Sequence, residues 1–173
     1  QGDDSDDLTV TNSGTIRAAG SKAINLKDTA DSIITNNLGG VIRSGAGDTI
    51  SGEAATGGTI TNSGTIYSDD QRAINLFSTS TTTTVTNNSS GHIYNSNTNE
   101  AIKLDGSSTL TNSGKIENKN SPTNNSIRLV GNDNTIILKD KSILIGTIDA
   151  GSTTGNTLKF QHGMGQGYYY KTS

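Results

Sequence analysis

The chain contains 173 residues, of which 29% are hydrophobic and 17% are charged, with a formal net charge of −3. A hydrophobic fraction this far below the usual ~45–50% would allow disorder, but the scarcity of charges argues against a solvated random coil. The acidic balance supplies no basic field and excludes nucleic acid and anionic lipid as partners, while the lack of cysteine excludes disulfides and thiolate metal sites.

Two short motifs alternate along the chain, and each returns at a nearly constant interval. The first motif, typified by V-T-N-S-G-T-I, places equivalent apolar residues at Val10, Ile34, Ile60, Val85 and Leu110, which are 24, 26, 25 and 25 residues apart. The second motif, typified by A-I-N-L, follows each copy of the first. Clusters of Gly, Asn, Ser and Asp separate three short apolar segments in every period, and this pattern predicts three short strands joined by turns.

A repeat of this kind is stable only if its copies stack. One coil cannot bury its own apolar face, whereas an identical coil about 4.8 Å above it pairs every strand edge and aligns the apolar side chains inside. The sequence therefore predicts an all-β fold, a right-handed parallel β-helix with three short strands per coil and about six to seven coils of ~25 residues.

The same pattern predicts the domain organisation. We expect an acidic N-terminal tail over residues 1–7, a single β-helix domain over 8–160, and a loop or interrupted strand over 161–173. Regular coils fill 8–130, and a denser pattern of β-branched residues predicts two further coils within 131–160. The predicted axial core consists of Val10, Ile16, Ile24, Ile34, Ile42, Ile50, Ile60, Ile66, Ile74, Val85, Ile93, Ile102, Leu110, Ile116 and Ile127.

One asparagine holds the same place in five successive coils, two residues after a core position and directly before a turn. Stacked amide side chains can hydrogen-bond to one another along the axis, and asparagine tolerates the backbone of a tight bend. We interpret this column as a structural ladder; the alternative, an amide row that binds glycans, requires the side chains to face outward. The five residues are Asn12, Asn36, Asn62, Asn87 and Asn112.

The T-N-S-G-T-I repeats resemble those of the passenger domains of bacterial autotransporters. The stretch from Gly131 to Phe160 (G-N-D-N-T-I-I-L, G-T-I-D-A-G, N-T-L-K-F) is similar to the coils that these proteins carry shortly before their membrane barrel. The resemblance implies export, passage through an outer-membrane β-barrel translocator in the same precursor, and display on the bacterial cell surface or release. Since neither a signal peptide nor a barrel is present, we expect the chain to be a fragment whose anchor lies beyond Ser173.

Residues for catalysis or metal binding do not assemble into a recognisable pattern. The only histidines, His92 and His162, lie outside any nucleophile elbow, and the acidic residues are scattered along the repeats. The acidic run before Leu8 has the composition of a solvated tail. We therefore predict no enzyme, no catalytic residues, no cofactor and no metal site.

The most plausible contact surface is a stripe of outward residues that follow the second apolar segment of each coil. It comprises Arg17, Arg43, Tyr67 and Tyr94, with Glu117 next in line, and Arg and Tyr are enriched at binding hot spots. An ordinary exterior ladder is the alternative interpretation of these residues. Two functions stay open: adhesion to a host-surface or matrix molecule or to another copy, and a spacer that carries an upstream protease, esterase or receptor-binding domain.

Overall fold

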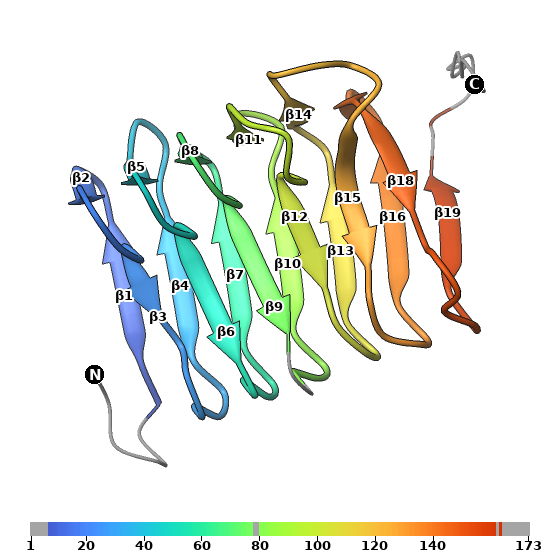
Figure 1. The fold of residues 1–173 in the computed structure, drawn as a ribbon, viewed down its shortest axis with the longest axis horizontal. Coiled ribbons are helices and arrows are strands. Elements are labelled where there is room, and N and C mark those ends of the chain that lie inside the picture. Colours follow the sequence, from blue (N-terminus) through green and yellow to red (C-terminus); the bar gives the residue numbers. More distant parts are fainter. Residues whose placement is uncertain (1–6, 78–79, 162, 164–173) are drawn as a thin grey trace.

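The structure, a computed structural model, describes residues 7–77, 80–161 and 163, and this part of the chain contains strands and turns but no helix. Accordingly, none of these residues forms a helix suited to crossing a membrane. All strand pairs are parallel and join residues about one repeat apart, so that the chain winds into a β-solenoid of about six turns with three strands in each. Figure 1 shows the coils stacked along one long axis.

Three sheets form the walls of the solenoid. Sheet A contains β1 (Thr9–Asn12), β4 (Ile33–Asn36), β7 (Thr59–Asn62), β10 (Thr84–Asn87), β13 (Thr109–Asn112), β16 (Thr135–Lys139) and β19 (Thr157–Gln161). Sheet B contains β2 (Thr15–Ala18), β5 (Val41–Ser44), β8 (Thr65–Ser68), β11 (His92–Asn95), β14 (Lys115–Asn118) and β17 (Ile143–Ile145). Sheet C contains β3 (Ile24–Asn25), β6 (Ile50–Glu53), β9 (Ile74–Phe77), β12 (Ile102–Leu104), β15 (Asn125–Leu129) and β18 (Thr147–Asp149).

The strands follow from the alternation of side chains in the two motifs. In β7 and β8, every second residue is buried and the residues between them are half-buried on the outer face. β-Branched Ile, Val and Thr suit this pleated, one-sided environment. The predicted fold is thereby confirmed in its parallel stacking, its three strands per coil and its repeat length.

The core runs as columns of Ile, Leu and Val along the axis. Thirteen of the fifteen predicted core residues are buried, from Ile24 to Ile127. The prediction was wrong for Val10 and Ile16, which are only half-buried. These two belong to β1 and β2, which pair with another described strand on one side only, so that no coil covers their second face.

The last part of the domain also differs from the prediction. Residues 131–160 were expected to form two coils, but they form one complete coil, β16 to β18, and the first strand of another, β19. The coil is shorter, because Thr135 pairs with Thr157 after 22 residues. Strand β19 extends through Gln161, one residue past the predicted boundary, whereas most of the predicted tails, 1–6, 162 and 164–173, lie outside the described residues.

Candidate contact surface

The asparagine column lies inside the solenoid, at the corner between sheets A and B. Its five amides form a continuous chain, in which each Nδ2 donates to the Oδ1 one coil further on. The four hydrogen bonds, Asn12 to Asn36, Asn36 to Asn62, Asn62 to Asn87 and Asn87 to Asn112, measure 2.8, 2.8, 2.9 and 2.8 Å. All five side chains are buried, and they therefore present no amide to an external glycan.

Each asparagine also holds the turn that contains the glycine of the same motif. The Nδ2 of Asn62 also donates to the carbonyl oxygen of Gly64, at 3.1 Å, so that each amide holds the turn of its own coil as well as the next amide. A Cβ atom at Gly64 would lie 2.2 Å from the carbonyl oxygen of Gly40 in the neighbouring coil. Only glycine permits coils to stack this closely. The asparagine column ends at Asn112, because the residue paired with it in the next coil is Leu138.

A second buried polar column, at the corner between sheets B and C, was missed by the sequence analysis. Ser44, Ser68, Asn95 and Asn118 are in register and buried, and each holds the turn that follows its strand. The Oγ of Ser68, for instance, accepts the backbone N–H of Gln71 at 2.8 Å. The signal was present in the recurrence of Ser or Asn two residues after the core isoleucine of sheet B.

The predicted stripe is a single column on the outer face of sheet B. Successive pairings align Arg17 with Arg43, Arg43 with Tyr67, Tyr67 with Tyr94, and Tyr94 with Glu117. Arg17 is exposed and the other four are half-buried. We call these five residues the sheet B column.

The two tyrosines form the centre of the column and are held by stacking. Their rings lie 4.7 Å apart between centroids, with an interplanar angle of 9°. The guanidinium carbon of Arg43 lies 5.1 Å from the centroid of the Tyr67 ring, and the Nζ of Lys119 lies 3.4 Å from that of Tyr94. Because neighbours cover the ring faces, the column presents ring edges and phenol hydroxyl groups.

Two of the three charged residues of the column, Arg43 and Glu117, are paired with neighbouring charges. Arg43 donates to Asp69 at 3.1 Å, and the Oε2 of Glu117 lies 2.7 Å from the Nζ of Lys115 and 3.0 Å from the Nε2 of His92. His92 also packs against Tyr94, with ring centroids 4.6 Å apart. The column is therefore a patch of paired charges around two tyrosines.

The pKa values of this cluster follow from its partial burial. Burial lowers the pKa of His92 below its ordinary value, although its hydrogen bond to Glu117 acts in the opposite direction. Burial would raise the pKa of Glu117, but hydrogen bonds from Lys115 and His92 outweigh it and lower that pKa. Burial, together with the nearby Tyr67 and Asp69, raises the pKa of Tyr94 to about 12, so that its hydroxyl stays protonated at neutral pH.

A mostly buried ion cluster lies at the corner between sheets B and C, near the start of sheet C. The Nε of Arg72 donates to Glu100 at 2.6 Å, and the backbone N–H of Arg72 donates to Asp48 at 3.1 Å. The amide of Asn75 donates to the second oxygen of Asp48 at 2.7 Å. Because these groups satisfy one another across three coils, the cluster holds the corner together and offers little to an external ligand.

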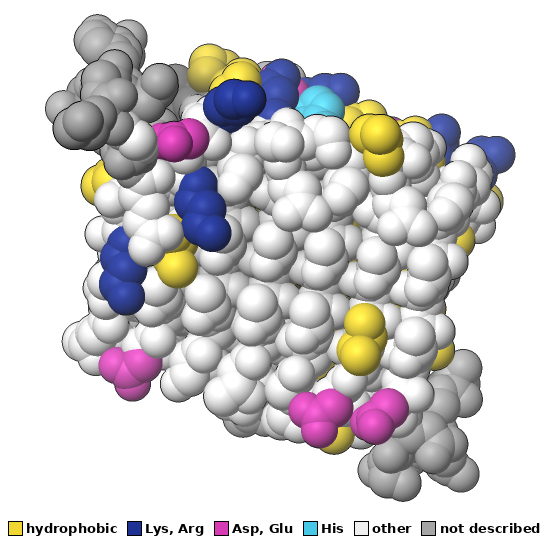
Figure 2. All heavy atoms as spheres, turned by 180° about the vertical axis from the view of Figure 1, so that it is seen from behind, with side chains coloured by type: hydrophobic (Ala, Val, Ile, Leu, Met, Phe, Trp, Pro, Cys, Tyr) yellow, Lys and Arg dark blue, Asp and Glu magenta, His cyan; other side chains and the backbone are white. Residues whose placement is uncertain are grey.

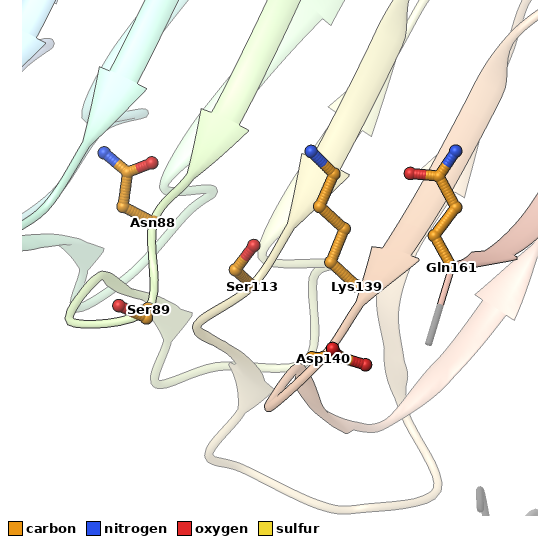
Figure 3. A pocket seen from close by; sticks show the side chains of 6 residues that line it. All are labelled: Asn88, Ser89, Ser113, Lys139, Asp140 and Gln161. Carbon is orange, nitrogen blue, oxygen red and sulfur yellow. The ribbon is translucent and has the colours of Figure 1, made fainter. Parts of the chain in front are cut away.

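A hollow of about 700 Å³ opens where sheets A and B meet, near the C-terminal end of the described chain. Figure 3 shows its polar lining, in which Asn88, Ser113, Lys139 and Gln161 come from four successive coils. It is widely open to solvent. Its lining lacks the apolar walls that usually enclose a small molecule.

Of the two histidines in the sequence, the structure describes His92 alone. His92 contacts Glu117 and Tyr94, and His162 lies outside the described residues. Within the described ranges, no three His, Cys, Asp or Glu side chains gather as a metal site. The sheet B column is therefore the best-ordered cluster of functional groups on the outer surface of the described chain.

No family model matches the chain, and the searches of curated proteins and solved structures gave no match either.

The asparagine column generates a stability prediction. Replacing Asn62 by Ala removes one amide and leaves the buried amide groups of Asn36 and Asn87 each short of a partner. We expect a loss of about 1–3 kcal/mol in the free energy of unfolding, measured by urea denaturation. Asn120→Ala, an exposed turn residue, is the matched control and should change stability by less than about 0.5 kcal/mol. Equal effects of the two substitutions would contradict the ladder.

The cluster around His92 generates a pH prediction. His92 and Glu117 both have pKa values that are lower in the folded state, so the folded protein binds fewer protons than the unfolded chain. Their contribution to stability is therefore present at neutral pH and is lost as the pH falls through the two folded-state pKa values. Replacing His92 by Thr, the residue at the paired position 65, removes the titrating imidazole. The free energy of unfolding of the variant should therefore fall less steeply between about pH 7 and 5. An unchanged dependence of stability on pH in the variant would contradict this prediction.

Proposed function

We propose that the chain is the repeat region of a displayed bacterial surface protein, and that it acts in adhesion or self-association through the outer faces of its solenoid. The sheet B column supports this proposal most directly. It is an extended row of Arg and Tyr side chains whose conformations are held by stacking before any partner arrives. Binding through such a row costs little side-chain ordering, and these residue types are the ones enriched at hot spots.

The resemblance of the T-N-S-G-T-I repeats to autotransporter passengers supports the cellular context of the proposal. In that context a β-barrel translocator belongs to the same precursor, and the chain reaches the cell surface or is released. A chain without cysteine suits such a route, because on this proposal the chain crosses the periplasm unfolded and then folds into the solenoid without disulfide formation. The partner in this proposal is a host-surface or matrix molecule, or a second cell that displays the same chain.

A second candidate is a spacer that carries an upstream catalytic or receptor-binding domain. The observation in its favour is that the charges of the sheet B column are mostly paired within the chain. The continuous core and the asparagine column also give the mechanical stiffness that a stalk needs. This proposal assigns no chemistry to the solenoid itself.

The two candidates differ in what clustered copies of the chain do. A single copy that binds through weak polar contacts should attach poorly, whereas copies fixed on beads should attach measurably, because multivalency raises the effective affinity. We expect beads that carry the chain to attach to host cells, to matrix proteins or to one another. Attachment no greater than that of bare beads would favour the spacer.

Substitution locates the contact on the solenoid. Tyr67→Ala combined with Tyr94→Ala should lower the attachment, because it removes the centre of the sheet B column. Leu38→Ala, which truncates an exposed side chain in the turn between β4 and β5 and outside the sheet B column, is the control and should leave attachment unchanged. All variants are compared well below their melting temperatures, since loss of the stacked pair costs about 0.5–1.5 kcal/mol. Full attachment by the double variant would place the contact on another face.

A further inference from the structure

The outer face of sheet A carries a nearly complete lattice of threonines. Each of its seven strands contributes one residue to each of two in-register outward columns, which gives fourteen positions. Threonine occupies eleven of them, and the exceptions are Ile33, Ile137 and Lys159. The eleven are Thr9, Thr11, Thr35, Thr59, Thr61, Thr84, Thr86, Thr109, Thr111, Thr135 and Thr157.

The lattice is regular in two directions. Along the axis its members repeat at the spacing between neighbouring parallel strands, about 4.8 Å, and across each strand they repeat every two residues, about 6.6 Å. The pairing of sheet A shows no register shift from β1 to β19. Threonine side chains are branched at Cβ and have few rotamers, so the methyl and hydroxyl groups hold their positions.

Lys159, on the last strand β19, is the one charged residue among the fourteen positions, and the threonine hydroxyl groups form no hydrogen bond within the described chain. Figure 2 views this side of the molecule, and its central area is almost without charged side chains, which gather at the rims. None of the eleven hydroxyl groups exchanges a hydrogen bond with another described residue, in contrast with Thr49, which donates from the core to a backbone carbonyl. Each hydroxyl group must therefore find its partners in water.

Water bound to such a lattice takes on its order. A hydroxyl group fixes the position of a bound water molecule, and the methyl groups between the hydroxyl groups leave the water there to bond with its neighbours. The bound layer consequently inherits the two repeats of the sheet. The shorter repeat is close to that of oxygen atoms along one direction of a prism face of hexagonal ice, and the longer repeat lies somewhat below the repeat in the other direction.

We infer that the threonine face of sheet A is an ice-binding surface, with crystalline water as its ligand. The inference is independent of the proposed adhesion. A second copy of the face is a poorer occupant because of the available area: seven strands, each contributing about four residues, cover on the order of 400 Å² per partner, about half of what a stable interface buries. An ice crystal, by contrast, presents a rigid surface, so that all the hydroxyl groups of the face contact it at the same time.

Slow growth of ice from a dilute solution of the 173-residue chain tests the inference. The chain should be enriched in the ice fraction relative to a non-binding protein of similar size, and it should slow the coarsening of fine ice crystals held just below the melting point. Exclusion of the chain from the ice, at the level of the non-binding protein, overturns the inference.

Two matched substitutions in one coil locate the effect. Thr61→Lys places a charged chain in the middle of the lattice, whereas Thr65→Lys makes the same change on sheet B, where the replaced threonine is equally half-buried. Thr61→Lys should reduce incorporation to the level of the non-binding protein, and Thr65→Lys should retain the wild-type level. Equal losses in both variants overturn the inference. So does a dimer at low temperature that Thr61→Lys abolishes without any incorporation into ice, because the face then pairs with itself.

Discussion

The structure depends on one constraint, which is that each coil lies in register on the next. Parallel pairing at a constant interval of about 25 residues places equivalent residues above one another, and every position in the repeat becomes a column. A column of apolar residues is buried in a common core, and a column of amides hydrogen-bonds along its length. A glycine is needed wherever two coils approach most closely, as at Gly64. The residues of the T-N-S-G-T-I motif are therefore the ones that the stacking of coils requires at each position.

The same constraint gives each outer face its own chemistry. Sheet B carries charged and aromatic side chains that pair with one another between coils, so that neighbouring residues hold the tyrosines in one conformation. Sheet A carries threonines whose hydroxyl groups have no protein partner among the described residues. Contacts within the chain fix the side chains of sheet B, whereas the hydroxyl groups of sheet A bond to water. The proposed adhesion therefore uses one face and the inferred binding of ice uses the other.

Most of the fold could be predicted from the sequence because its signals are local and repeated. The 25-residue interval, the alternating apolar residues and the amides before the turns are visible without any long-range information, and the asparagine column lies where these signals place it. The burial of Val10 and Ile16 was overestimated, because burial depends on a covering coil and not on the residue itself. The second of the two coils predicted in 131–160 is incomplete, because the four apolar segments of this stretch form the three strands of one coil, β16 to β18, and only the first strand of the next, β19.

The details of the candidate site were less predictable. Register alone places Tyr67 beside Tyr94, but the contact of Lys119 with the Tyr94 ring depends on how a turn side chain reaches back over the sheet. The ion cluster of Arg72 joins Asp48, Arg72 and Glu100, which directly precede the second motif in three successive coils, but their charge changes from coil to coil and gives no repeated signal. Such contacts arise from side-chain geometry, which a pattern of residue types does not contain.

The central claim, that the coils stack in register around the buried amides, can be tested most directly by nuclear magnetic resonance of the asparagine side chains. The account predicts scalar coupling across the hydrogen bond between the Nδ2 of Asn62 and the Cγ of Asn87, together with side-chain amide protons that exchange slowly with solvent. Side-chain amides at Asn36, Asn62 and Asn87 that all exchange at the rate of an unstructured peptide, with no coupling between coils, would contradict the account.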